Sequence, residues 1–169
     1  TVNGGTLTNL TIVVGTAATA ASNRLVVTGN STVNVNSLQA LWTNNVVQFQ
    51  GGVINSLSTT VSNGVLALSN TCSIASSPSV NVAAGAILDV SGLVSPFGLA
   101  ATQILGGSGG IVGNVSLTAG TIAPGIGGLG TLSFTNNLSL DGSLTTTNLF
   151  ELTSPGTGDL IQVAGDLSF

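Results

Sequence analysis

Ionisable side chains are the natural starting point for any chemistry, and this sequence of 169 residues has very few of them. Arg24 is the only base, because the chain contains no Lys and no His, and Tyr is absent as well. The acids are Asp89, Asp141, Glu151, Asp159 and Asp166. Enzymes that cleave polysaccharides on a β-helix need clustered acids, often with calcium, and a strong base. The sequence therefore predicts no catalytic residue, no cofactor and no metal ligand, and a carbohydrate-active enzyme is the least favoured class.

The acids are better explained as turn and surface residues. Asp159 and Asp166 lie seven positions apart and could share a corner that binds calcium, but carboxylates that accept backbone N–H bonds in turns are favoured. Asp141, in "LDGS", is predicted to be a turn residue. Glu151 lies in an alternating stretch that points it outward, and Arg24 is expected to be solvated or paired once.

Three further residue types invite a functional interpretation. Cys72 is the single cysteine, so no internal disulfide can form, and its apolar neighbours predict a small buried side chain. Trp42 could form a platform for a sugar, although a corner or core aromatic is favoured. The glycosylation triplet N-x-S/T begins at Asn9, Asn30, Asn114 and Asn137. The chain is so rich in Asn, Ser and Thr that chance alone predicts about this number.

The composition excludes several classes of partner. Hydrophobic residues make up 43% of the chain and charged residues 4%, with a net charge of -4. Nucleic acid is excluded as a partner because no basic footprint exists. The uncharged stretch 97–132 is long enough to span a bilayer, yet it contains "GGSGG" and "GIGGLG", which argue against membrane insertion. The same glycine-rich segments lack the Lys and the following helix of a phosphate loop.

The pattern along the chain indicates short strands and no convincing helix. Apolar residues recur with period two and are separated by turn formers such as "TGNS", "SNG" and "SPGTG". The expected inward-facing sets are Leu10/Ile12/Val14, Leu25/Val27, Val33/Val35, Val47/Phe49, Leu66/Leu68, Val80/Val82, Leu88/Val90, Val115/Leu117, Leu132/Phe134, Leu138/Leu140, Phe150/Leu152, Ile161/Val163 and Leu167/Phe169. A weaker spacing of six links Leu68, Ile74, Val80 and Ala86, and likewise Val35, Leu41, Val47 and Val53.

A chain that runs straight for a few residues, bends and runs straight again is typical of a β-solenoid. We therefore predict an all-β fold, a single-stranded parallel β-helix with rungs of roughly 20 residues, forming one domain over residues 1–169. This fold also explains the missing charges. Equivalent side chains of successive rungs stack about 4.8 Å apart, so like charges would repel while Asn, Ser, Thr, Val and Leu stack favourably.

Two segments resemble a known repeat. The sequence "AGTIAPGIGGLGTLSFTNNLSLDGS" at 119–143 and the tail "FELTSPGTGDLIQVAGDLSF" resemble the autotransporter-associated β-strand repeat, as does "GGTLT" at 4–8. The best match covers residues 79–169. The matching features are a Gly-Thr-apolar start at 120–122, Pro124-Gly125, Gly-Thr-Leu at 130–132, Asp159, and the final "VAGDL" at 163–167. The resemblance implies a right-handed parallel β-helix, export, and a place on the bacterial cell surface.

The function expected from these features is structural. We predict a secreted or cell-surface protein that assembles head to tail into a filament, for a biofilm matrix, attachment or a sheath. Its partner would be a second copy, with segment 1–14 meeting the C-terminal rung 160–169, since both alternate without a protective Lys or Pro. The alternative is a segment of a long adhesin-type passenger that acts as a binding module or stalk. Carbohydrate binding is a further option without direct support.

Overall fold

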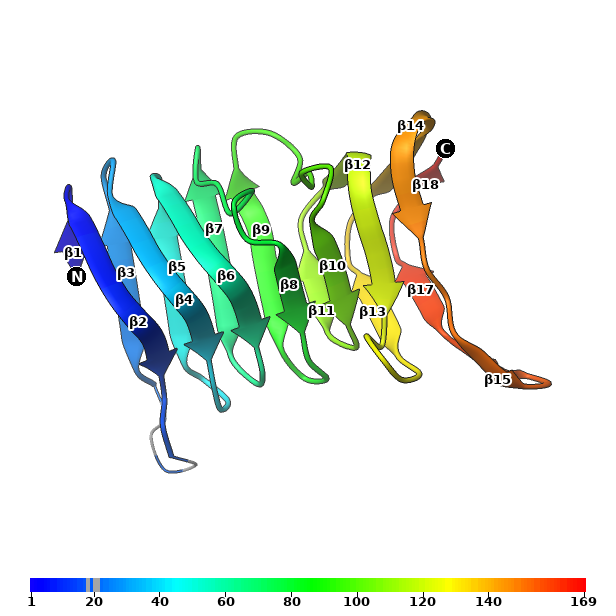
Figure 1. Cartoon of the computed structure of the whole chain (residues 1–169), viewed down its shortest axis with the longest axis horizontal. Coiled ribbons are helices and arrows are strands. Elements are labelled where there is room, and N and C mark those ends of the chain that lie inside the picture. The colour runs from blue at the N-terminus through cyan, green and yellow to red at the C-terminus, as the bar shows by residue number, and fades with distance from the viewer. Residues whose placement is uncertain (18, 20–21) are drawn as a thin grey trace.

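The computed structural model describes the whole chain except residues 18, 20 and 21, and it describes no side chains at 9–10 and 142–145. The described residues form strands and turns but no helix, and therefore no helix that could span a membrane. Two eight-stranded sheets make up the body of the molecule. Successive strands of the chain alternate between them, and Figure 1 shows the resulting stack.

Each sheet takes one strand from every turn of the chain. Sheet A contains β1 (Val2–Asn3), β3 (Arg24–Thr28), β5 (Val46–Gln50), β7 (Val65–Asn70), β9 (Ile87–Leu93), β11 (Gly110–Val112), β13 (Thr131–Phe134) and β17 (Leu160–Val163). Sheet B contains β2 (Thr6–Val14), β4 (Thr32–Ala40), β6 (Val53–Val61), β8 (Ser79–Val82), β10 (Ile104–Gly107), β12 (Val115–Pro124), β14 (Leu138–Asn148) and β18 (Leu167–Ser168).

The strand register confirms the predicted β-solenoid. All neighbours within sheets A and B pair in parallel, and in sheet A Arg24 lies opposite Val46, which lies opposite Val65. These steps are 22 and 19 residues (46 − 24 and 65 − 46), close to the expected rung length. The right-handed coiling implied by the resemblance stays a prediction.

The core lies between the two sheets and is lined by alternate residues of each strand. In β5, Val47 and Phe49 are fully buried, while their neighbours in the strand are half-buried. The longer strands of sheet B bury two such pairs with a change of phase between them, as Val33 and Val35 are followed by Leu38 in β4. One continuous cluster of buried apolar residues extends from Val14 to Leu140.

Most of the predicted inward-facing sets are confirmed. Every named set from Val33/Val35 to Leu138/Leu140 is buried. Val14 and Val27 are buried as well, but Ile12 and Leu25 of the same sets are only partly buried, and the three sets in the last 20 residues are not buried. The four residues spaced by six from Leu68 to Ala86 are also buried, but Val53 of the second series is 40% exposed, so that series is wrong at its end. The side chain of Leu10 lies outside the described residues.

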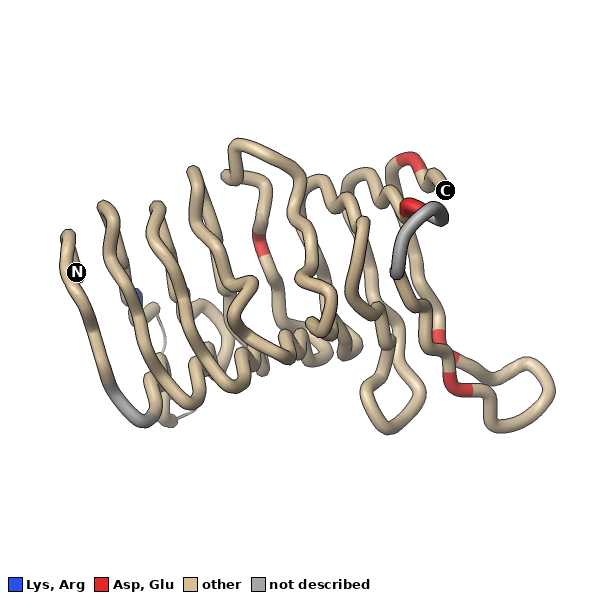
Figure 2. The backbone as a smooth tube through the Cα atoms, turned by 45° about the horizontal axis from the view of Figure 1, so that its top comes forward, with Lys and Arg blue, Asp and Glu red and all other residues tan. Residues whose placement is uncertain are grey.

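The set Phe150/Leu152 is wrong, because this segment leaves the stack. It leads into a small antiparallel hairpin of β15 (Leu152–Ser154) and β16 (Thr157–Gly158), which belongs to neither large sheet. Phe150 is 44% exposed and Leu152 is 81% exposed. In Figure 1 the hairpin projects beyond the last turn along the long axis of the stack, and Figure 2 shows it as a separate loop.

Candidate functional site

The charged residues do not converge on one place in the described structure. Asp89 lies in the middle of sheet A, where its carboxylate accepts hydrogen bonds from the backbone N–H and hydroxyl of Ser91. Arg24 lies near the N-terminal end and donates one hydrogen bond to Gln48, as expected for an arginine paired once. Figure 2 shows the remaining acids near the opposite end. The described residues hold no group of three His, Cys, Asp or Glu side chains that could bind a metal ion.

Asp159 and Asp166 do not share a corner, so the calcium alternative is wrong in its geometry. They lie before and after β17, and that strand separates them. The Asp159 carboxylate instead accepts backbone N–H bonds from Gly130 at 2.8 Å and from Glu151 at 2.7 Å. This confirms the predicted turn role for Asp159, and it fastens the base of the β15–β16 hairpin to the preceding turn of the solenoid.

Asp141 is not the turn residue that "LDGS" predicts, because β14 continues through it. The Asp-Gly pair lies within β14, at a shift in the register with which β14 pairs with β12. Leu117 and Ala119 of β12 lie opposite Leu140 and Thr145 of β14, so β14 takes five steps where β12 takes two and contains three extra residues. Register with the neighbouring strand on both sides of this irregularity therefore overrides the local turn preference.

Cys72 is a structural residue, as predicted. Its side chain is buried and forms no disulfide. Burial raises the pKa of the thiol to about 12, against a smaller lowering effect of a hydrogen bond with the Ser73 backbone. Reactive cysteines have a lowered pKa instead, so Cys72 has the environment of an inert thiol.

Trp42 lies at a corner between β4 and β5, which confirms the corner interpretation and excludes a core position. Its φ of 64° places it in the left-handed region, and its side chain is 41% exposed. A role as a sugar platform stays a prediction.

A buried group of hydroxyls was not predicted from the sequence. Ser56 lies 2.8 Å from the Thr59 hydroxyl and 2.5 Å from the Ser77 hydroxyl, inside the core. The Gln103 side chain closes the group by donating to the backbone oxygens of Ile74 and Ser77. None of the hydrogen-bond partners is an acid or a base, so the group satisfies its own polar atoms and lacks the means to activate a nucleophile. Its only sequence signal was a serine at an inward position of an alternating strand.

The two ends of the solenoid are the remaining candidates for a functional site. At the N-terminal end, β2 forms the edge of sheet B, and no described strand covers its outer side. In sheet A, the two-residue β1 covers only Val27 and Thr28, so the first residues of β3 also lie at the edge. Val2, Leu7 and Ile12 contact the core but are only partly buried.

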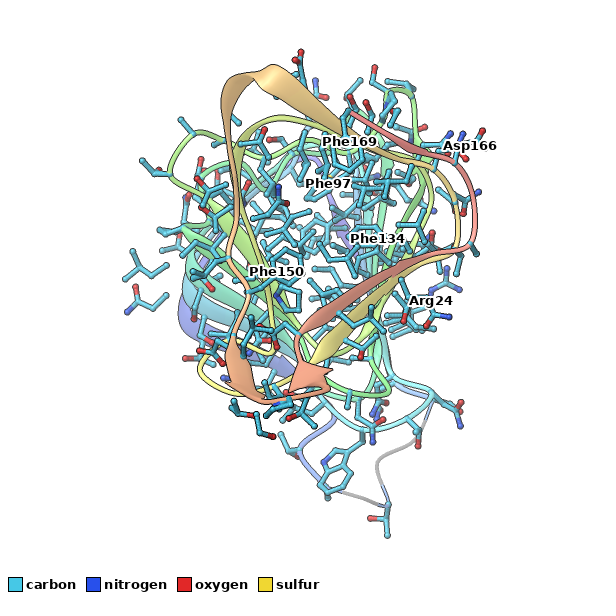
Figure 3. All side chains as sticks on the ribbon, turned by 90° about the vertical axis from the view of Figure 1, so that its right-hand side faces the viewer. Arg24, Phe97, Phe134, Phe150, Asp166 and Phe169 are labelled. Atoms are coloured by element: carbon cyan, nitrogen blue, oxygen red, sulfur yellow. The ribbon has the colours of Figure 1, made fainter. Side chains whose placement is uncertain are left out.

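The C-terminal end has the same two-sheet cross-section. β17 is the edge strand of sheet A, and β18 covers only Leu138 and Ser139 at the start of the longer β14. Ile161 and Val163 contact the core but are only partly buried, while Leu167 is 49% exposed and Phe169 is 86% exposed. Figure 3 looks onto this end, and the label of Phe169 lies above those of Phe97 and Phe134 in this view.

Comparisons with known proteins add no assignment. No family model matches the chain, and neither the curated proteins nor the solved structures contain a match. The candidate site is therefore defined by its geometry: the edge strands and partly buried apolar residues at the two ends of the described stack.

Proposed function

We propose that this protein is an extracellular structural element that assembles head to tail into a filament. The observation that carries the proposal is the complementarity of the two ends. Each presents parallel edge strands of the same two sheets around the same apolar core. Contact between two different ends does not close on itself, so it generates a linear polymer.

The joint would continue both sheets from one copy into the next. β2 of the incoming copy would extend sheet B, and the start of β3 would extend sheet A along β17. Backbone pairing of this kind supplies affinity through main-chain hydrogen bonds, as in strand addition between subunits. The edges carry little protection against it, because no Lys or Pro interrupts β2 or β17.

β18 determines the form of this joint. If β2 pairs along the whole of β14, its first half must take the place of β18, which lies against Leu138 and Ser139. β18 is held by these two residue pairs and by the hydrogen bonds of Asp166, which precedes it, with the Asn137 side chain and the Leu138 backbone. The Leu167 side chain is about half exposed, and that of Phe169 is largely exposed. We therefore favour a joint in which β2 of one copy replaces β18 of the other, within the proposed contact between segment 1–14 and rung 160–169.

The proposal is tested by placing a charge in the joint. Val163→Lys or Ile12→Lys should abolish filaments, because each leaves an unpaired charge in an apolar contact. Ser95→Lys, at an exposed position away from both ends, is the control and should leave assembly unchanged. Light scattering and negative-stain electron microscopy measure assembly, and thermal unfolding followed by circular dichroism checks that each variant is folded.

A different outcome would favour the second candidate. If the unmodified chain stays monomeric at high concentration, or filaments form through the flanks with both ends free, head-to-tail assembly is wrong. The segment of a longer adhesin-type passenger then takes its place, with the neighbouring turns of a longer chain covering the ends. The resemblance to the autotransporter-associated repeat supports secretion and a surface location under both candidates. The scattered acids and the single base argue against the third, a carbohydrate-active enzyme.

A further inference from the structure

The β15–β16 hairpin is the largest departure from the regular stack. It connects β14 to β17 and projects past the last turn of the solenoid (Figure 1). Its Leu152 is 81% exposed, and the flanking apolar residues Phe150 and Leu160 are 44% and 51% exposed. The hydrogen bonds of Asp159 to Gly130 and Glu151 fix its base to the body of the molecule. The hairpin therefore projects from the stack with its base fixed by hydrogen bonds and its apolar surface exposed.

A groove lies at the corresponding position of the other end. It has a volume of about 360 Å³ and is lined by Val13, Val14, Gly15, Thr16, Asn23, Arg24 and Leu25. These residues form the corner at which the chain leaves β2 and enters β3. We name this feature the β2–β3 groove. Its apolar lining residues are Val13, Val14 and Leu25, and its one charged side chain is Arg24, the single base of the protein.

The hairpin and the β2–β3 groove belong to the same edge of the solenoid. Every turn has one connection from the end of a sheet B strand to the start of a sheet A strand, and these connections form a row along the stack. The connection from β2 to β3 is the first of the row, and the connection from β14 to β17 is the last. In a head-to-tail joint, the hairpin of one copy therefore extends toward the groove of the next.

We propose that the β15–β16 hairpin of one copy docks into the β2–β3 groove of a second copy and locks the joint. This inference rests on the proposed head-to-tail assembly and names a second contact within it. The chemistry is complementary. Leu152 would cover the apolar side chains of Val13 and Leu25. The carboxylate of Glu151, at the start of the hairpin, would approach the groove that contains Arg24.

Cysteine cross-linking tests the contact directly. In a Cys72→Ala background, Thr153→Cys on the hairpin and Thr16→Cys in the groove should give a ladder of disulfide-linked multimers under mild oxidation. The matched control keeps Thr16→Cys but moves the other cysteine to the flank as Ser95→Cys, and it should give no ladder. A ladder from the control that equals that of the test pair would overturn the assignment.

A second experiment measures the contribution of the contact. Leu152→Asp should raise the critical concentration for filament formation at least about tenfold, the effect of losing one buried leucine side chain. The matched control is Leu57→Asp, since Leu57 is also exposed (68%) but lies in the middle of the stack. If Leu152→Asp forms normal filaments and the Thr153→Cys/Thr16→Cys variant gives no disulfide ladder, hairpin docking is refuted but head-to-tail assembly is not. An unmodified chain that forms no filaments would refute the proposed function itself.

Discussion

The interior of the stack and its last turn carry the same sequence pattern with opposite results. Leu132 and Phe134 are separated by one residue and are 0% and 1% exposed, respectively. Leu167 and Phe169 have the same spacing, yet they are 49% and 86% exposed. The difference lies in the neighbours, because β13 is paired on both sides whereas β18 is paired on one. In a solenoid, an apolar residue is buried by the turns above and below it, so a strand at the end offers a contact surface.

The largest expected effect compares one phenylalanine from each region. Phe49→Ala should lower the free energy of unfolding by about 3–5 kcal/mol, because it removes a fully buried ring from the core. Phe169→Ala should change it by no more than about 0.5 kcal/mol in the free chain. Urea unfolding at a protein concentration below the onset of assembly measures both. Equal destabilisation by the two variants would contradict the difference in burial between the middle and the end.

A smaller effect separates the stack from the hairpin. Gly52 has a φ of 91°, and a Cβ there would overlap the backbone oxygen of Ser31 in the preceding turn. Gly52→Ala should therefore lower the free energy of unfolding by at least about 2 kcal/mol, because the cost of a left-handed backbone at alanine adds to the cost of the overlap. Gly156, in the hairpin, has a φ of 83° but no atom near its would-be Cβ, so Gly156→Ala should cost about 1 kcal/mol. Thermal unfolding of the two variants compares them, and the reverse order would contradict this account.

The smallest effect concerns Cys72 in the middle of the stack. Its pKa is raised from 9.0 to about 12 by burial, so the unfolded chain loses its thiol proton first as the pH rises. The free energy of unfolding should therefore be nearly unaffected below pH 9 and fall by about 1 kcal/mol by pH 10. Because the sequence has no Lys and no Tyr, few other groups titrate in this range. Cys72→Ala should flatten the alkaline limb of a pH series of urea unfolding curves, and an unchanged limb would exclude Cys72 as its cause.

The candidate site could be predicted only in part. Alternation predicts strands in segment 1–14 and rung 160–169, and the structure places β2 and β17 at sheet edges, because an edge strand keeps the pattern of an interior one. Their role in assembly stays a prediction. The hairpin was missed because Phe150 and Leu152 alternate as the residues of a core strand do. Only the structure shows that this segment pairs with neither large sheet. The buried hydroxyls of Ser56 and Ser77 were missed for a related reason. A polar side chain can face inward wherever a partner from another turn satisfies it.

The sequence by itself determined the class of the fold. Period-two apolar residues, frequent turn formers and the near absence of charge are local and compositional properties, and together they specify short parallel strands in a repeating stack. Only the tertiary structure decided which repeats become core and which leave the stack. That choice depends on contacts between residues of neighbouring turns, as for β14 around Asp141, where Leu117 pairs with Leu140, and for Asp159, which binds the backbone of Gly130, 29 positions earlier. Hydrogen bonds and contacts between turns set this register, and they form only when the neighbouring turn is in place.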